Sequence, residues 1–148
     1  MIAHRAFLEV AEELSDGSSE AHWRSAVSRA YYACYHTARW LLQTCGFRPP
    51  EHESAHAYLW RRLSNSGHPD IESVGKQMNS FRQTRNRADY DLDHSIDQET
   101  ALEFVYTVEK IIDVLEIVPT LPSVQEQITE AIKKYEREVL REVTWHEN

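Results

Sequence analysis

Apolar residues recur every three or four positions along residues 19–45, and this spacing constrains the fold more than any other feature of the chain. The recurring residues are Val27, Tyr31, Cys34, Ala38, Leu41 and Cys45. Such spacing places them on one face of an α-helix. Gly46, with Pro49 and Pro50 beyond it, is a typical helix stop. The segment is therefore predicted to be one long helix with its apolar face in a core.

Helical periodicity and breaker residues predict five further helices, and no segment has a convincing strand pattern. The expected ranges are 2–14, 51–63, 69–90, 97–118 and 123–143. Long helices joined by short loops are typical of an up-and-down bundle. We therefore predict an all-α fold, with an up-and-down bundle of four to five helices in residues 1–118 and an additional C-terminal amphipathic helix in residues 119–148.

The last two predicted helices differ in the width of their apolar faces. Residues 97–118 have a broad face and should be the most buried, with Leu102, Phe104, Val105, Val108, Ile111, Ile112 and Leu115. Residues 123–143 have a narrow one, with Val124, Ile128, Ile132, Tyr135, Val139 and Val143. A narrow stripe packs on one neighbour, which is either the bundle of its own chain or a second subunit.

The charge balance limits the partners of the chain. Sixteen basic residues against twenty-four acidic ones give a net charge of −8, which argues against binding phosphate backbones over a broad surface but leaves room for a local basic cleft. Cys34 and Cys45 are too far apart on one helix, at about 1.5 Å per residue, to form a disulfide. No run of about 18 apolar residues is present. We expect a cytoplasmic protein with no membrane segment.

Three arginines gather in the stretch "FRQTRNRADYDLDH", residues 81–94. The apolar positions before it are Ile71, Val74, Met78 and Phe81, and the same spacing continues to Arg85 and Ala88. Arg85 is thus predicted to face the core, where an unpaired charge is costly. Asp89, four residues on, lies on the same face and can pair with it. Arg82 borders that face, whereas Arg87 should face outward.

Two interpretations of this inward arginine stay open. In the first, Arg85 and Asp89 form an ion pair that closes one end of the bundle. In the second, Arg85 points into a cleft, where its planar guanidinium would bind a phosphate or another anion through two N–H groups. Asn86 and Tyr90 have the same four-residue spacing on the adjacent face.

Two motifs together carry a resemblance to a known family. The segment "SRAYYACYHTARWLL" (residues 28–42), followed by "RNRADYD" (residues 85–91), resembles the HEPN superfamily of small helical domains, over roughly residues 2–118. The resemblance implies a helical bundle that is frequently a homodimer. It also implies relatives that are metal-independent ribonucleases of toxin–antitoxin and antiphage systems, many encoded beside a minimal nucleotidyltransferase. Other relatives bind RNA or a protein partner without catalysis.

The active-site pattern of that family is an arginine, a polar residue and then a histidine after four to six intervening residues. Arg85 and Asn86 match its first two positions, and Tyr90 stands at the histidine position, as in a subgroup resembling R-x-x-ADYD. A second alignment pairs Arg87 with His94. We prefer the first, because Arg87 is followed by an alanine and lies off the core-facing stripe.

The resemblance implies roles for these residues. Arg85, assisted by Arg82 or Arg87, would hold the phosphate charge, and Asn86 would orient a phosphate oxygen or the base. The tyrosine is the difficulty, because a phenol titrates near pH 10 and an imidazole near 6.5. A nearby arginine could lower the tyrosine pKa, or His94 or His36 could replace it. No metal or cofactor is implied.

Two other patterns have structural explanations. The sequence "HESAH" is a literal H-E-x-x-H at His52 and His56, but it falls at a helix start and lacks a third ligand. The aromatic residues around 31–40 are best explained as core packing. Within that group, Tyr32 or His36 is the candidate to face the Arg85 site across the bundle.

Two functions of different classes follow. The first is a HEPN-type domain of nucleic-acid metabolism or defence, a metal-independent endoribonuclease toxin or its RNA-binding relative. The second is a catalytically inactive module that dimerises and binds RNA or a partner protein, such as an antitoxin or a nucleotidyltransferase.

Overall fold

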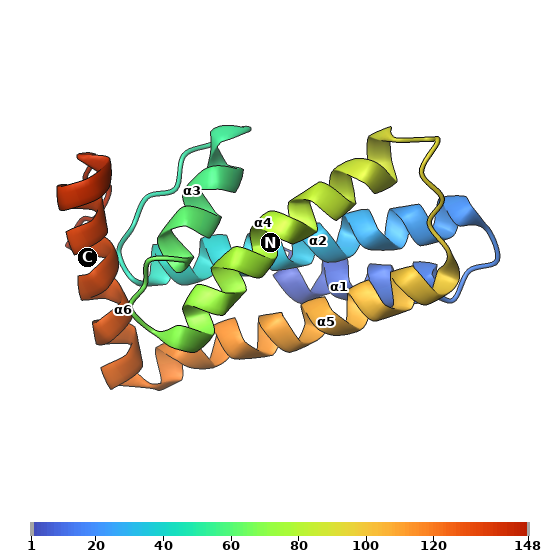
Figure 1. Ribbon diagram of the computed structural model, residues 1–148. Coiled ribbons are helices and arrows are strands. Elements are labelled where there is room, and N and C mark those ends of the chain that lie inside the picture. The colour runs from blue at the N-terminus through green and yellow to red at the C-terminus, as the bar shows by residue number, and fades with distance from the viewer. Residues whose placement is uncertain (1, 148) are drawn as a thin grey trace. The chain divides into compact units, whose positions relative to one another are not determined.

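The computed structural model describes residues 2–147, and within them the chain is all-helical with no strand (Figure 1). The helices are α1 (His4–Ser15), α2 (Glu20–Thr44), α3 (Ser54–Leu63), α4 (Pro69–Tyr90), α5 (Gln98–Ile117) and α6 (Pro122–Tyr135). A 3-10 turn, Val118–Thr120, precedes α6, and a π-helical turn, Glu136–Leu140, follows it. The predicted all-α class with an additional C-terminal helix is confirmed.

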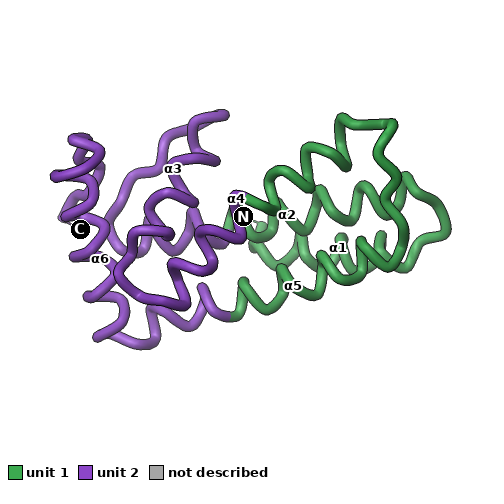
Figure 2. The backbone as a smooth tube through the Cα atoms, in the orientation of Figure 1, with its two compact units in different colours: residues 1–36, 80–113 green, residues 37–79, 114–148 purple. Residues whose placement is uncertain are grey.

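The chain forms two compact units (Figure 2). Unit 1 comprises residues 1–36 and 80–113, and unit 2 comprises residues 37–79 and 114–148. Helices α2, α4 and α5 each contribute residues to both units. The units are therefore not the two sequence segments 1–118 and 119–148, and that division stays a prediction.

Unit 1 is a four-helix bundle of α1, the first part of α2, the end of α4 and most of α5. Its core contains Leu8, Ala11, Ala26, Val27, Ala30, Tyr31, Ala33, Cys34, Ala88, Val105, Val108 and Ile112. The alanines of α2 are fully buried, so neighbouring helices can approach its backbone closely. The rings of Phe81 and Phe104 pack edge to face at 5.1 Å between centroids. Ala88 is buried, as the helical phase of the arginine stretch predicts.

Leu102 departs from the predicted core of α5. Its side chain is 42% exposed, and Ala101 takes the buried position in that turn. The neighbouring buried residues are Ala101, Phe104, Val105 and Val108, which form a regular helical face. Leu102 lies about 100° around the helix from Ala101 and so falls outside that face. The prediction that Leu102 is buried was wrong.

The end of α2 in unit 2 has the geometry of a glycine-terminated helix. Gly46 has φ +104, its N–H donates to the carbonyl of Gln43 (3.0 Å), and the N–H of Phe47 donates to the carbonyl of Leu42 (2.9 Å). These two bonds satisfy carbonyls that the helix end leaves without partners. Residues 140–147, called the C-terminal segment below, pack against this turn. The Trp145 indole donates to the carbonyl of Cys45 (2.9 Å).

Replacing Gly46 with alanine should destabilise the protein by about 1–3 kcal/mol, because a left-handed alanine is strained and its methyl has no space. A Cβ at Gly46 would lie 2.7 Å from the Trp145 Nε1 and 2.9 Å from the His146 carbonyl oxygen. Gly67 is the matched control, since it has φ +74 but meets only the Cβ of Ala131, at 3.1 Å. Urea denaturation should show a larger loss for Gly46→Ala than for Gly67→Ala. Equal losses would mean that the C-terminal segment does not dock on this turn.

The predicted C-terminal helix ends earlier than expected. Helix α6 stops at Tyr135, a π-helical turn follows, and Arg141 then takes a left-handed conformation at φ +54. Ile128 and Ile132 are buried as predicted, but Val139 and Val143 are 67% and 65% exposed. A π turn adds a residue per turn and so rotates the apolar stripe away from its neighbour. The extension of the helix and its stripe to Val143 was therefore wrong.

Cys34 and Cys45 are buried free thiols, so no disulfide links them. Burial raises the pKa of Cys34 to about 12 and also raises the pKa of Cys45. A thiol with a raised pKa is a poor nucleophile, which fits the role of small core residues. Within residues 2–147, none of the helices combines the length and the apolar character that crossing a bilayer requires.

Candidate functional site

Arg85 is the centre of a charged and aromatic cluster in unit 1. Its side chain is 11% exposed, and its Nε lies 2.9 Å from the Asp89 Oδ2. The inward orientation and the pairing with Asp89 are thus as the helical phase predicts. The guanidinium carbon lies 5.1 Å from the centroid of the Tyr32 ring and 5.5 Å from that of Tyr90. A cation near two aromatic rings is stabilised by their quadrupoles.

The hydrogen bonds of Arg85 leave part of its guanidinium uncommitted. Nη1 donates to the Asn86 Oδ1 at 3.0 Å. Nε is buried, and although the Asp89 carboxylate is close enough for an ion pair, its direction does not give Nε a hydrogen bond. A buried N–H without an acceptor carries a desolvation cost. Because Asp89 already lies beside Nε, an incoming anion would bind the Nη groups of the guanidinium, whose paired N–H groups suit phosphate and carboxylate oxygens.

Helix α2 holds the Asp89 carboxylate in place. The Ser28 hydroxyl donates to the Asp89 Oδ2 at 3.0 Å. Ser28 and Tyr32 are one turn apart on α2, and they contact Asp89 and Arg85, which are one turn apart on α4. Each of two residues one turn apart on α2 therefore contacts one of two residues one turn apart on α4. The hydroxyl and the ring fix the ion pair from the opposite side of the bundle.

Arg24, one turn before Ser28, binds the C-terminal end of α4. Its Nη1 donates to the carbonyls of Arg87 (3.1 Å), Ala88 (3.0 Å) and Asp91 (3.0 Å), and its Nη2 donates to the carbonyl of His94. The last carbonyls of a helix have no partner within it and carry partial negative charge. The Arg87 and Asp91 carbonyls also accept from the backbone N–H groups of Asp91 (3.0 Å) and His94 (3.3 Å). Arg24 adds a charged donor to these bonds and so fixes the turn that carries the site.

Sequence reasoning missed both Arg24 and Ser28. The available signal was their four-residue spacing with Tyr32, which places all three on one side of α2 next to the apolar stripe. The spacing alone does not say which helix they face. That information depends on the tertiary packing of α2 against α4.

Replacing Arg24 with alanine should loosen the end of α4 by about 1–2 kcal/mol, because hydrogen bonds from a charged donor to four backbone carbonyls are lost. Amide hydrogen exchange should show faster exchange at Ala88 and neighbouring amides, with α1 unchanged. Arg87→Ala removes the same charge at an exposed position and should leave exchange as in the wild type. Unchanged protection in Arg24→Ala would contradict the capping role.

The aromatic residues of α2 extend from the arginine toward α1. The Tyr32 ring lies 6.3 Å from that of His36, and His36 stacks on Phe7 at 5.0 Å. The sequence predicts that either Tyr32 or His36 faces Arg85, and Tyr32 is the one whose ring contacts the guanidinium. His36 lies one ring further from the guanidinium. Burial raises the pKa of Tyr31, which outweighs the opposing effect of the positive charges on Arg82 and Arg85.

The remaining candidate residues lie at the exposed edge of the cluster. Asn86 is exposed, and Tyr90 has 73% of its surface accessible while its ring still contacts the arginine. Arg87 is exposed, as predicted. Arg82 is half-buried. His94 lies in the exposed loop after α4, and its backbone carbonyl contacts Arg24.

The H-E-x-x-H pattern does not form a two-histidine face. His52 has φ +69 and precedes the start of α3 at Ser54, whereas His56 is buried inside that helix. The two imidazoles are thus not one helical turn apart on one surface, as a zinc site of this kind requires. Within the described residues 2–147, no group of three or more His, Cys, Asp or Glu side chains is placed to hold a metal ion.

The fold and the site together define a small all-α domain with an inward arginine between two aromatic rings. The family model of the HEPN domain matches residues 4–118. A protein of Methanocaldococcus jannaschii named "Putative toxin MJ0605" is 30% identical over 113 residues, which cover 74% of this chain and 83% of that protein. No solved structure matches the chain. The chain belongs to the HEPN family, as the two sequence motifs predict.

Proposed function

We propose that the chain is a toxin-type HEPN domain that binds single-stranded RNA at Arg85 and cleaves it without a metal ion. The observation that carries the proposal is the Arg85 guanidinium, a cation whose side chain is 11% exposed and which lies beside the exposed Asn86 and Tyr90. The naming of the archaeal relative as a toxin supports the cellular role. The family supports RNA as the substrate class.

The chemistry assigned to this site is transesterification of an RNA phosphodiester. The 2′-oxygen bonds to phosphorus as the bond to the 5′-oxygen breaks, which leaves a 2′,3′-cyclic phosphate and a 5′-hydroxyl. Arg85 stabilises the charge that develops on the phosphate oxygens, and the Asn86 amide orients one of them. A phenol is protonated at neutral pH, so Tyr90 donates a proton to the leaving oxygen, and the proton of the 2′-hydroxyl passes to water.

Growth of a bacterial host tests the proposal. Induced expression of the wild type should arrest growth, whereas Arg85→Ala should not. Lys76→Ala is the matched control, because it removes one positive charge from an exposed position of the same helix and should still arrest growth. Circular dichroism and a melting curve of each purified variant check that the fold is intact. Growth arrest by Arg85→Ala at wild-type strength would contradict the proposal.

A second function, a non-catalytic interaction module, is favoured by a different observation. Tyr90 and Leu92 are 73% and 82% exposed at the end of α4. Exposed apolar groups next to a site are typical of a protein interface, here with a second copy of the chain, an antitoxin or a nucleotidyltransferase. Light scattering of the wild type and of a Leu92→Ser variant measures self-association. A dimer that Leu92→Ser dissociates, with no RNA cleavage by the wild type, would favour this function.

A further inference from the structure

Unit 2 contains a pocket that the Arg85 site does not use. The pocket has a volume of about 320 Å³ and is lined by Pro50, Ser54, Ala57, Tyr58, Arg61, Arg62, Leu140 and Glu142. Five of these residues follow the spacing of one face of α3, and Leu140 and Glu142 of the C-terminal segment form the opposite wall. Pockets of this size, with an apolar wall and a few polar groups, are typical of small-molecule sites.

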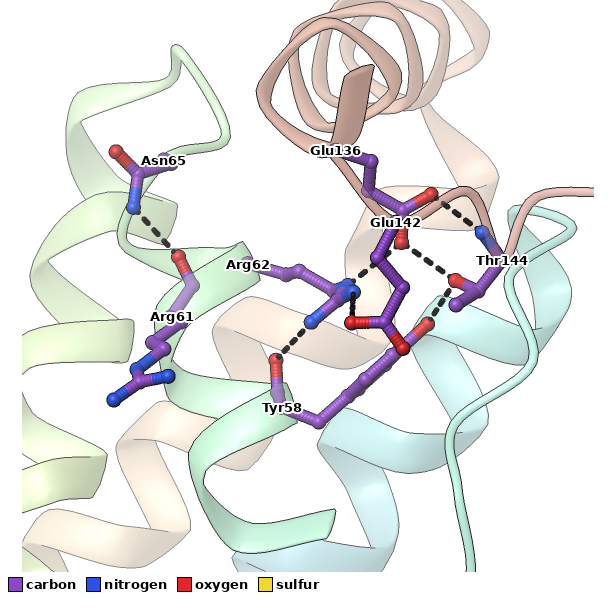
Figure 3. A network of polar contacts seen from close by, with 7 residues as sticks. All are labelled: Tyr58, Arg61, Arg62, Asn65, Glu136, Glu142 and Thr144. Atoms are coloured by element: carbon purple, nitrogen blue, oxygen red, sulfur yellow. Dashed lines mark hydrogen bonds and ion pairs between the residues drawn. The ribbon is translucent and has the colours of Figure 1, made fainter. Parts of the chain in front are cut away.

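One of the residues that line this pocket is the buried Arg62. Its polar contacts are drawn in Figure 3 and leave part of its guanidinium without a hydrogen bond. The Arg62 side chain is 3% exposed, its Nε donates to the Glu136 Oε2 at 2.8 Å, and its Nη1 donates to the carbonyl of Tyr58 at 3.4 Å. The Tyr58 ring covers one face of the guanidinium, with its centroid 3.4 Å from the central carbon. Nη2 is buried and has no hydrogen bond.

A carboxylate at the outer limit of ion-pair distance faces this Nη2. The Glu142 Oε2 lies 4.0 Å from it, at the outer limit of an ion pair, and the Glu142 side chain is 68% exposed. An ion pair at that distance with one exposed partner contributes little to stability. When Glu142 turns toward solvent, two positive charges, on Arg61 and Arg62, and one negative charge, on Glu136, remain at the pocket. The net charge there is then +1.

We propose that this pocket binds the phosphate of a small phosphate monoester. One phosphate oxygen accepts a hydrogen bond from the Arg62 Nη2 and takes the place of the Glu142 carboxylate. The organic part of the ligand lies along Pro50, Ala57 and Leu140. Arginine suits this role because its guanidinium keeps its charge when buried and its N–H groups match phosphate oxygens. The site is separate from the proposed RNA site, and neither proposal depends on the other.

Titration with phenyl phosphate tests the proposal, with benzyl alcohol as the uncharged comparison and benzoate as the carboxylate comparison. Calorimetry should give a dissociation constant of about 1 mM or lower for phenyl phosphate in the full chain, with weaker binding of benzoate and none of benzyl alcohol. Amide shifts in an NMR titration should be largest at Ser54, Ala57 and Arg62. Inorganic phosphate should bind more weakly than phenyl phosphate, because it lacks the apolar part.

Two acidic variants separate the pocket from general charge effects. Glu142→Gln removes the carboxylate that competes with the phosphate for the Arg62 Nη2. It should tighten phenyl phosphate binding by only about fivefold, because solvent screens the charge of an exposed side chain. Glu138→Gln changes the net charge equally but lies outside the pocket, and it should bind as the wild type does. Ala57→Leu fills the pocket and should abolish binding, whereas Arg85→Ala should retain it.

Three results would overturn the proposal. The first is no binding of phenyl phosphate at about 10 mM by either the wild type or Glu142→Gln. The second is equal tightening by Glu138→Gln and Glu142→Gln, which would reflect net charge alone. The third is loss of binding in Arg85→Ala with retention in Ala57→Leu, which would assign the phosphate to unit 1.

Discussion

Replacing Tyr90 with histidine should raise the rate of RNA cleavage by about 10²–10⁴-fold at neutral pH, the usual contribution of a general acid–base group. The substitution places an imidazole at the exposed edge of the arginine cluster, where the Tyr90 ring now contacts Arg85. An imidazole exchanges protons near pH 6.5, whereas a phenol does so near pH 10. The fold should be unaffected, because the Tyr90 side chain is 73% exposed.

The pH dependence and a second variant identify the reason for such a gain. Because position 90 donates the proton to the leaving 5′-oxygen, the rate of Tyr90→His should fall as pH rises through about 6.5, since only the protonated ring is an acid. Tyr90→Phe keeps the ring but lacks the hydroxyl, and it should cleave more slowly than the wild type. A Tyr90→His variant no faster than Tyr90→Phe would show that position 90 takes no part in proton transfer.

Replacing Glu136 with leucine should destabilise the protein by about 3–5 kcal/mol, because it leaves the buried Arg62 guanidinium without its counter-charge. Glu136 is fully buried and accepts hydrogen bonds from the Arg62 Nε (2.8 Å), the Thr144 N–H (2.9 Å) and the Thr144 hydroxyl (2.5 Å). The Thr144 hydroxyl lies 2.5 Å from the Tyr58 hydroxyl (Figure 3). One carboxylate thus connects α3 to the C-terminal segment.

A double-mutant cycle measures how much of this loss belongs to the unpaired charge. Urea denaturation of Glu136→Leu, Arg62→Met and the double variant should show strong coupling, with the double variant more stable than Glu136→Leu alone. Glu138→Leu is the control, since Glu138 is exposed and lies two residues from Glu136 in the same π-helical turn. A loss below about 1 kcal/mol in Glu136→Leu would mean that the carboxylate does not compensate Arg62.

The features that sequence predicts well here are those that local chemistry decides. Helix α4 runs from Pro69 to Tyr90 as predicted, because proline favours the first turn of a helix and the apolar spacing fixes its phase. The same phase places Arg85 on the inner face and Asp89 beside it. The stop at Gly46 follows from the preference of glycine for positive φ.

The features that sequence did not predict depend on contacts between distant segments. Arg24 and Ser28 join the site only because α2 packs against the end of α4. Helix α6 changes to a π-helical turn at Glu136, whose side chain binds Arg62, 74 positions earlier in the chain. An apolar stripe alone would continue that helix to Val143. The pattern of one helix contains no information about such a partner.

Cleavage of single-stranded RNA in the presence of EDTA, by the purified wild type and by Arg85→Ala, tests the central claim most directly. We predict that the wild type leaves 2′,3′-cyclic phosphate ends and that Arg85→Ala is slower by about 10²–10³-fold. The melting temperature of Arg85→Ala should also fall, because the Arg85 side chain is 11% exposed and contacts two aromatic rings, so cleavage is compared at a temperature at which circular dichroism shows both proteins folded. Equal cleavage by both proteins, together with a clearly lowered melting temperature for Arg85→Ala, would contradict the account and would make Arg85–Asp89 a structural ion pair.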